Sequence, residues 1–231
     1  MIRIGKLLPS ITNSQGDAEN ADAIVTALNW MSRPATLVSF HSRAVLTNCD
    51  AYVLGHVTES DFDEASAQVQ KWSAGLREQV RSGSALLAVG SGLELLTSAG
   101  LLGGVVGRRA SRSVGDCVVD SGTSQLWGFE NSASSYVPSD QEQTLGRVLS
   151  GAGNGDGFEG VRVAFGDGLV LGTHLHGPVL VRNEELMDEV LTVLTGSPEI
   201  RLTSQDGIIA RELARQNRAE VVAKVLKAKR T

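Results

Sequence analysis

Two hydrophobic periods alternate along this chain, and residues 85–97 show the change from one to the other most clearly. Ala85–Val89 is a continuous apolar run, typical of a strand buried on both faces of a parallel sheet. Gly90-Ser91-Gly92 follows, and a helical pattern then continues through Thr97. Because a helix N-terminus directs free N–H groups toward the end of the preceding strand, this unit predicts a site above the turn.

The first half of the chain repeats this order of strand and helix. Three further strands are predicted at Ile2–Leu8, Thr36–Phe40 and Asp50–His56. One helix opens at Gly16-Asp17, with Asp17 as a candidate N-cap, and another opens at Asp61, before apolar residues at helical spacing. This alternation predicts an α/β fold with a mainly parallel, doubly wound central sheet and right-handed crossovers.

The second half changes in character, because strands and turns replace the alternation. Strands are predicted at Asp116–Val119, Ser124–Phe129, Val161–Phe165 and Leu169–His174, which suit an antiparallel extension of the sheet. The glycine-rich segment Gly151–Gly160 is interpreted as a hairpin turn, since it lacks the alternating acidic positions of a calcium loop. Two helices follow, Glu184–Leu194 capped by Asn183 and a last one over about Gln205–Lys227. We expect a single domain over residues 1–231.

Composition and charge narrow the class of protein. The net charge of −5 argues against non-specific nucleic-acid binding. Cys49 and Cys117 each stand beside β-type residues and are interpreted as buried free thiols of a cytosolic protein. The apolar run at the N-terminus is too short for a signal peptide or a membrane span, so a cytoplasmic protein is predicted. No residue pattern predicts a cofactor.

Two histidines follow the last predicted strand, in His174-Leu175-His176-Gly177-Pro178. Residues two apart on a strand share a face, so both imidazoles are expected to point the same way. Three interpretations stay open: a catalytic base at a strand end, two ligands of a metal ion, or polar residues without chemistry. A metal site needs a third and a fourth ligand, and no other cluster has that spacing, so none is predicted.

Gly90-Ser91-Gly92 contains half of a nucleophile elbow. A serine hydrolase would need Ser91 activated by a histidine that an acid holds, and the full Gly-x-Ser-x-Gly sequence is absent. A turn that needs small residues for packing is the favoured interpretation. His56, at the end of the third strand, is expected to line the same edge of the cleft.

Four motifs stand in a distinctive order along the chain. They are Gly16-Asp17 with Asn20, Gly128-Phe129-Glu130-Asn131, the glycine loop with Gly151-Ala152-Gly153-Asn154 and Asp156-Gly157-Phe158-Glu159-Gly160, and Gly172-Thr173-His174-Leu175-His176-Gly177-Pro178. In this order they resemble the class I glutamine amidotransferases of the CobB/CobQ-like branch, and most of all the glutaminase subunit of lipid II isoglutaminyl synthase. The resemblance covers nearly the whole length and implies the family's three-layer α/β fold.

The same resemblance implies the roles of particular residues. His176 occupies the position of the family's catalytic histidine, and Arg112 the position of an arginine that reads the carboxylate of glutamine. The family's nucleophile turn reads Cys-Gly-Gly-Tyr-Gln, and here Gly90 replaces the cysteine. A run of glycines that shapes the family's oxyanion site is replaced by Gly55-His56-Val57. His56, Gly92 and Arg112 are therefore the expected substrate-binding residues.

These departures predict a subunit that has lost glutaminase activity. Glutaminase chemistry forms a thioester on a thiolate, and glycine offers no nucleophile. Ser91 is expected to point elsewhere, and no carboxylate partner for His176 is evident, so Ser91 is only a weak alternative nucleophile. The expected partner is a Mur-ligase-like synthetase acting on the peptidoglycan precursor, docked through exposed apolar residues near Leu93 or Val57. Two alternatives stay open: an active hydrolase that uses Ser91, and a module that binds a small ligand without catalysis.

Overall fold

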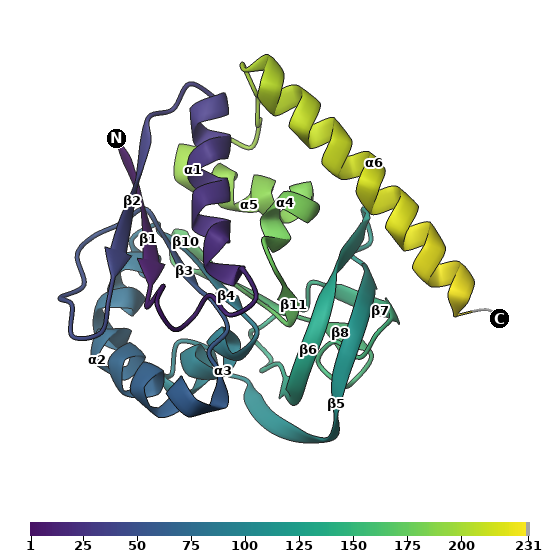
Figure 1. Cartoon of the computed structure of the whole chain (residues 1–231). Helices are drawn as coiled ribbons and strands as arrows, with labels where there is room; N and C mark the ends of the chain where they lie inside the picture. Colours follow the sequence, from purple (N-terminus) through teal and green to yellow (C-terminus); the bar gives the residue numbers. More distant parts are fainter. Residues whose placement is uncertain (230–231) are drawn as a thin grey trace.

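Two β-sheets organise the chain in the computed structural model, which describes residues 1–229 (Figure 1). The larger sheet has six strands in the order β2-β1-β3-β4-β10-β9, all parallel except β9. Its strands are β1 (Ile2–Leu7), β2 (Ala35–Phe40), β3 (Ala51–Leu54), β4 (Ala85–Val89), β9 (Val161–Phe165) and β10 (Gly168–Thr173). The predicted α/β class with a mainly parallel sheet is confirmed. Arg230 and Thr231, at the end of the expected domain, lie outside the described residues.

The smaller sheet is antiparallel and has the strand order β11-β6-β5-β7-β8. Its strands are β5 (Val105–Asp120), β6 (Gln125–Val137), β7 (Gly146–Ser150), β8 (Phe158–Glu159) and β11 (Leu175–His176). Of the four strands predicted in the second half, Val161–Phe165 extends the larger sheet in the antiparallel sense as β9, and Leu169–His174 joins that sheet in parallel as β10. The other two, Asp116–Val119 and Ser124–Phe129, belong to this separate sheet. The physical reason lies in their burial, because buried and more exposed residues alternate along β6, which suits a sheet covered on one face.

Helices cover both faces of the larger sheet and give the chain three layers (Figure 1). The helices are α1 (Asn20–Trp30), α2 (Phe62–Arg81), α3 (Ser91–Ser98), α4 (Val179–Arg182), α5 (Glu184–Thr195) and α6 (Gln205–Ala228), with short 3₁₀ turns at Asp17–Glu19 and Glu59–Asp61. None of the helices within residues 1–229 is long and apolar enough to cross a bilayer. The long helix α6 lies on the outside and reaches the smaller sheet at its C-terminal end.

The central strand β4 shows how the two faces are filled. Its five residues are all buried, and they alternate between two hydrophobic clusters. Ala85, Leu87 and Val89 pack with α1 and α5, whereas Leu86 and Ala88 pack with α2 and α3. The first cluster also contains residues of the smaller sheet, so a shared core holds the two sheets together.

The predicted helix caps at Asp17, Asp61 and Asn183 are wrong as hydrogen-bonded caps. None of these side chains bonds to a free N–H of the helix that follows it. Asn183 instead exchanges hydrogen bonds with the backbone of Trp127 in β6, and Asp61 accepts one from the Thr58 hydroxyl. Each polar side chain meets a group that is distant in sequence or lies on the preceding turn, which local capping preferences do not anticipate.

Two smaller interpretations from the sequence are confirmed. β7 and β8 pair as the two arms of a hairpin around the glycine-rich segment, and the Glu130 carboxylate accepts hydrogen bonds from the backbone of Ala152 and Gly153. Both cysteines are buried and free. Burial raises the pKa of Cys49 to about 11, so this thiol stays protonated at neutral pH.

We expect Gly92→Ala to destabilise the fold by about 1–3 kcal/mol, the usual cost of overpacking a tight core. A Cβ atom at this position would lie 2.6 Å from the Leu54 carbonyl oxygen of β3, which is backbone and cannot move aside. Urea unfolding measures the change in the free energy of unfolding. Ser98→Ala, on the exposed side of the same helix, is the matched control and should change stability by less than about 0.5 kcal/mol. Equal stability of the two variants would contradict the close approach of α3 to β3.

Candidate functional site

The turn between β4 and α3 lies at the carboxyl end of a central strand, as the sequence predicted. Gly90 forms its apex with φ 59° and ψ −128°, a backbone conformation that is strained for residues with a side chain. Its N–H donates to the carbonyl of Thr173 in the neighbouring strand β10 at 2.8 Å. Open α/β sheets place their sites at this edge. Gly92 packs on the backbone of β3 and does not line the cleft above the turn.

His176 faces this turn and has an acidic partner. Its Nδ1 lies 3.1 Å from Oδ2 of Asp17, and both side chains are buried, the histidine only 2% exposed. The expectation that His176 lacks a carboxylate partner is therefore wrong. Asp17 precedes it by 159 residues, so sequence proximity gave no sign of the pair. The signal in the sequence is the motif Gly16-Asp17 with Asn20, whose residues also fit the start of a helix.

The Asp17 carboxylate also fixes the backbone on both sides of the site. Oδ1 accepts the N–H of Gly177 at 2.7 Å, and Oδ2 accepts the N–H of His56 at 3.2 Å. Asn20, one turn later, donates to the Gly177 carbonyl and accepts the N–H of Leu180. Through these bonds, the segment after β1 holds the end of β3 and the segment around His176 in one arrangement.

The two ring nitrogens of His176 have different surroundings. Because Nδ1 donates to Asp17, the neutral ring keeps its lone pair on Nε2. Nε2 is buried and has no hydrogen-bond partner among the described residues. An imidazole held by a carboxylate, with a free Nε2, has the geometry that a general base requires.

His56 lies beside His176, and the hydrogen-bonding roles of its two ring nitrogens are reversed. Its Nδ1 accepts the N–H of Ser91 at 3.2 Å, which leaves the ring proton on Nε2. The two imidazole rings meet edge to face, with centroids 4.9 Å apart. Burial, followed by the neighbouring His176, lowers the pKa of His56 to about 4. The ring is therefore neutral at pH 7 and can donate a hydrogen bond from Nε2.

The Ser91 hydroxyl bonds to the loop after β3 and makes no hydrogen bond to His176. It accepts the N–H of Val57 at 2.8 Å, lies 3.0 Å from the Val57 carbonyl and 3.1 Å from Nδ1 of His56. Ser91 is only 7% exposed. These contacts tie α3 to the loop after β3, so the hydroxyl has a structural partner on every side.

Gly90 has no room for a side chain. A Cβ atom placed on it would overlap Cε1 of His176 and would lie 2.8 Å from Nδ1 of His56. The two rings therefore occupy the space that a side chain at the apex of the turn would need. In the sequence resemblance, this is the position of the nucleophilic cysteine.

A cleft of about 670 Å³ opens above these residues, between the loop after β3, the start of α3 and the strands β5 and β6. His56, Gly90, Ser91 and His176 form one end of it. Arg112 also lines the cleft, with its guanidinium 2.8 Å from Oδ1 of Asn131. Leu93 and Val57 are themselves buried. The docking surface of exposed apolar residues expected near them stays a prediction.

His174 takes no part in this cleft. The strand β10 stops at Thr173 and β11 joins the smaller sheet, so His174 and His176 do not share a strand face as predicted. His174 lies 3.4 Å from Glu159, which also accepts the Thr173 hydroxyl. Burial alone would raise the pKa of Glu159, but its bonds to His174 and Thr173 lower it. No group of three or more potential metal ligands exists within residues 1–229.

Comparison of sequences finds two similar proteins, both of one kind. Subunit GatD of lipid II isoglutaminyl synthase (glutamine-hydrolyzing) from Staphylococcus aureus is 28% identical over 156 residues, 62% of this chain and 63% of the relative. The corresponding subunit of Streptococcus pneumoniae is 31% identical over 93 residues, 39% of this chain and 35% of the relative. The chain thus matches less than two thirds of the length of these relatives. No protein-family model matches it.

Solved structures define the fold class. The structure of PurLQS from Thermotoga maritima superposes with a TM-score of 0.58 at 16% identity, over 85% of this chain and 97% of that one. A glutamine amidotransferase from the same organism superposes with a TM-score of 0.51 at 14% identity, over 98% and 94% of the two chains. The chain has the class I glutamine amidotransferase fold. Within that class, its sequence is similar to the GatD subunit of lipid II isoglutaminyl synthase.

The lowered pKa of His56 predicts a loss of stability in mild acid. The unfolded chain takes up a proton on this residue near pH 6.5 and the folded chain only near pH 4, so the stabilisation is complete above 6.5 and falls as the pH drops toward 4. In His56→Asn, the amide oxygen can still accept the Ser91 N–H but does not titrate. Between pH 6.5 and 4, we expect the free energy of unfolding of this variant to fall by roughly 1–3 kcal/mol less than that of the parent protein. The size follows because one pKa unit is worth about 1.4 kcal/mol and water partly screens the ring.

Urea unfolding at a series of pH values measures this difference. His41→Asn is the matched control, because His41 is exposed. The control should retain the pH dependence of the parent protein. If His56→Asn also keeps that dependence unchanged, the buried neutral state of His56 is wrong.

Proposed function

We propose that this chain is a glutamine amidotransferase-like subunit that no longer hydrolyses glutamine and that acts with a Mur-ligase-like synthetase in the amidation of lipid II, or in its regulation. Similarity to GatD supports the pathway, and the amidotransferase fold supports the type of subunit. The proposal includes membership of the CobB/CobQ-like branch, a single domain over residues 1–231, and a cytoplasmic location.

The crowding at Gly90 is the observation that carries the loss of glutaminase activity. Hydrolysis of glutamine through a thioester needs a thiolate that attacks the amide carbon, and a base that takes the thiol proton. The base is represented by His176 with its free Nε2. At the apex of the turn, however, the imidazoles of His176 and His56 fill the space of a nucleophile's side chain. The acid and base of the chemistry are in place, and the attacking atom is missing.

An active hydrolase that uses Ser91 is the less favoured alternative. The Ser91 hydroxyl bonds to the backbone of Val57 on both its donor and its acceptor side, and His56 rather than His176 is the imidazole beside it. His56 has no acidic partner for its ring among the described contacts, in contrast with the paired His176. Removing the hydroxyl from these bonds would leave the Val57 N–H unpaired in a buried place.

Binding of a small ligand without catalysis is the second candidate, and the cleft itself favours it. Its volume of about 670 Å³ lies within the usual range for small-molecule sites. Arg112 offers a cation, and Glu94, bonded to the Ser134 hydroxyl at 2.5 Å, offers an anion. A zwitterionic amino acid has both complementary charges, so an amino acid or its amide fits the cleft.

The partner surface is proposed at the end of the β5–β6 ribbon that lies opposite its hairpin turn. Val105 and Val137 stand opposite each other in the register of the two strands and are 66% and 58% exposed. The next residues, Val106 and Gly107, line the cleft. An exposed apolar pair beside a cleft is a suitable contact for a synthetase that receives the product of that cleft.

We expect the isolated protein to release no measurable glutamate from glutamine, because losing a nucleophile that acts together with its base costs several orders of magnitude in rate. The assay is glutamate release by the purified chain, with Ser91→Ala as the companion variant. Steady glutamate release that Ser91→Ala abolishes would establish the serine hydrolase instead.

Two variants test whether crowding is the obstacle. Gly90→Cys alone should stay inactive, because the new side chain meets both imidazoles. Gly90→Cys combined with His56→Gly removes one ring and returns the loop to the glycine-rich sequence of the family, so its activity should exceed that of the single variant. Binding of glutamine to both variants is the control for a folded cleft. Equal activity of the two would contradict the obstruction by His56.

We expect Val105→Lys with Val137→Lys to abolish co-purification with a Mur-ligase-like synthetase encoded in the same genome, because charges would be buried in an interface of typically about 1,200–2,000 Å². Val181→Lys, at a valine on α4 that is 49% exposed, is the matched control and should leave the complex intact. The parent protein, the double variant and the control should all have the same thermal stability. If the complex survives the double substitution, the docking surface does not include Val105 and Val137.

A further inference from the structure

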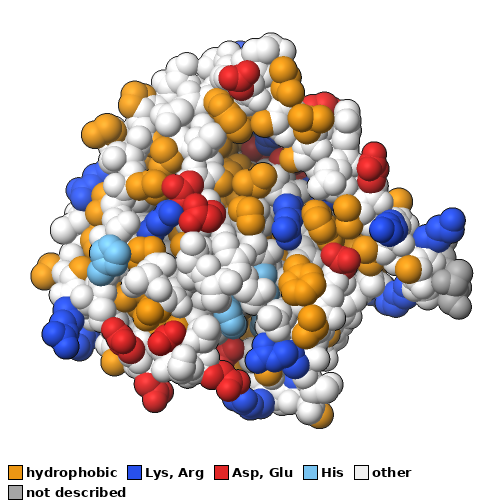
Figure 2. Space-filling model, in the orientation of Figure 1, with side chains coloured by type: hydrophobic (Ala, Val, Ile, Leu, Met, Phe, Trp, Pro, Cys, Tyr) orange, Lys and Arg blue, Asp and Glu red, His pale blue; other side chains and the backbone are white. Residues whose placement is uncertain are grey.

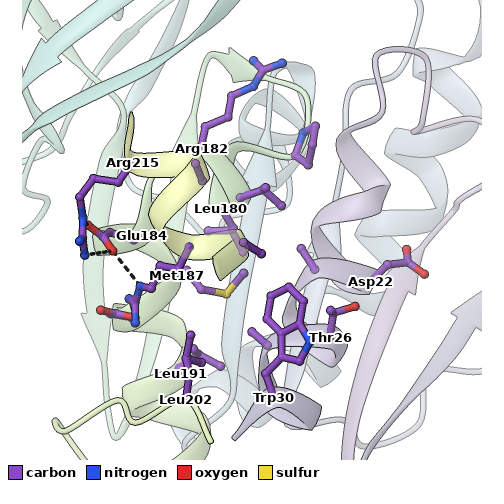
Figure 3. A pocket seen from close by; sticks show the side chains of 18 of the residues that line it. Asp22, Thr26, Trp30, Leu180, Arg182, Glu184, Met187, Leu191, Leu202 and Arg215 are labelled. Atoms are coloured by element: carbon purple, nitrogen blue, oxygen red, sulfur yellow. Dashed lines mark hydrogen bonds and ion pairs between the residues drawn. The ribbon is translucent and has the colours of Figure 1, made fainter. Parts of the chain in front are cut away.

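A half-enclosed apolar pocket lies between α1 and α6, with α4 and α5 as its floor (Figure 3). Figure 1 shows where these helices lie in the molecule. Figure 3 shows Trp30 from α1 facing Met187 and Leu191 from α5. In the orientation of Figure 1, the surface is hollowed here and bordered by hydrophobic side chains (Figure 2). We propose that this pocket binds a small amphiphile with an apolar tail and an anionic head, that Arg182 receives the head, and that binding is coupled to His176.

The pocket exists because α6 is attached through charged side chains. Arg211, Arg215 and Arg218 follow one another at spacings of four and three residues, which places them on one face of the helix. They pair with carboxylates of α5: Arg211 and Arg215 bond to Glu184, and Arg218 bonds to Glu185. Long ion pairs hold the helix at a distance, where direct apolar packing would have closed the gap. The remaining volume is about 370 Å³, enough for a small ligand.

Among the arginines that line this pocket within residues 1–229, Arg182 is the one without a direct ion pair, although the carboxylates of Asp116 and Asp17 act on its charge from a distance. The three arginines of α6 have carboxylate partners. Glu19, just before α1, and Asp22 in α1 both pair with the Lys6 ammonium group. Arg182 makes no ion pair within residues 1–229; its guanidinium lies 4.7 Å above the Trp127 ring. Asp116, whose charge acts on it, is bonded to the Trp127 indole.

Burial supports this assignment of the anionic head. It lowers the pKa of Arg182, as expected for a cation that has lost water without gaining a bonded carboxylate. A carboxylate or a phosphate monoester supplies the planar or clustered oxygens that a guanidinium binds best. The apolar lining calls for an apolar tail, and Arg182 calls for an anionic head. A molecule with both resembles a fatty acid or an alkyl phosphate.

The pocket is connected to the cleft through the segment that carries His176. Arg182 donates to the carbonyl oxygen of His176 at 3.2 Å. Asn20, the first residue of α1, bonds to the Gly177 carbonyl and to the Leu180 N–H, so one side chain pins two walls of the pocket beside His176. A ligand that engages Arg182 or shifts α1 from α4 therefore changes the surroundings of the His176 ring. This inference is independent of the proposed loss of catalysis.

Calorimetric titration with decanoate, decyl phosphate and decyltrimethylammonium tests the ligand class. The two anions should bind, and the cation with the same tail should bind at least about tenfold more weakly, the usual difference for one charged hydrogen bond. Whichever anion binds more tightly identifies the head group. Equal binding of all three probes, or of none, overturns the proposal.

Variants locate the binding site. Ala214→Phe fills the pocket from α6 and should abolish binding of decanoate, while Arg182→Gln should weaken it by at least about tenfold. Arg215→Gln is the matched control, because it removes the same charge from the pocket at a position where Glu184 already compensates it. Thermal unfolding shows whether each variant is folded. Undiminished binding to Ala214→Phe, or an equal loss in Arg215→Gln, contradicts the site.

The coupling has its own measurement. The chain contains four histidines, so the imidazole C–H signals can be assigned by NMR with single substitutions. Decanoate should shift the signal of His176 and leave that of the exposed His41 unchanged. Binding without a shift of His176 would remove the coupling from the proposal. Sedimentation of the protein alone shows whether a second copy fills the pocket, and a dimer that decanoate fails to dissociate would overturn the ligand assignment.

Discussion

One buried carboxylate determines the arrangement of the site. Asp17 accepts hydrogen bonds from the His176 ring and from the backbone N–H groups of Gly177 and His56. These three donors come from the end of β3 and from β11 and the turn after it. A buried carboxylate without such donors would be costly to keep ionised, and the donors would be costly to leave unpaired. Both sheets therefore meet at this point in a fixed geometry, and the cleft takes its shape from it.

Two imidazoles of opposite hydrogen-bonding character result from this geometry. His176 presents an acceptor at Nε2 because Asp17 takes its Nδ1 proton, and His56 presents a donor at Nε2 because Ser91 donates to its Nδ1. Their edge-to-face contact places the two rings beside the apex of the turn at Gly90. The combination suits recognition of a neutral polar group, such as an amide, better than it suits formation of a covalent bond.

The sequence predicted the parts of this architecture that depend on local pattern. The apolar run of β4, the glycine turn and the helical periods were each visible, and they lie where expected. The acid at position 17 was misinterpreted because a short polar residue after glycine is also what a helix start requires, and its partner is 159 residues away. The separate second sheet was missed for a similar reason: alternation along β6 identifies a strand, but not the sheet to which it belongs.

The absence of space at Gly90 also has a consequence for the evolution of such a chain. A side chain at the apex of the turn meets His176 and His56 together, so the effect of a substitution at position 90 depends on the residue at position 56. The effect of a substitution at one position therefore depends on the residue at the other. A single substitution at the apex is unfavourable while His56 is present. An altered loop relieves the contact with His56 but leaves the contact with His176 in place. The two positions form an epistatic pair, and the order in which they change is constrained by the packing of two rings.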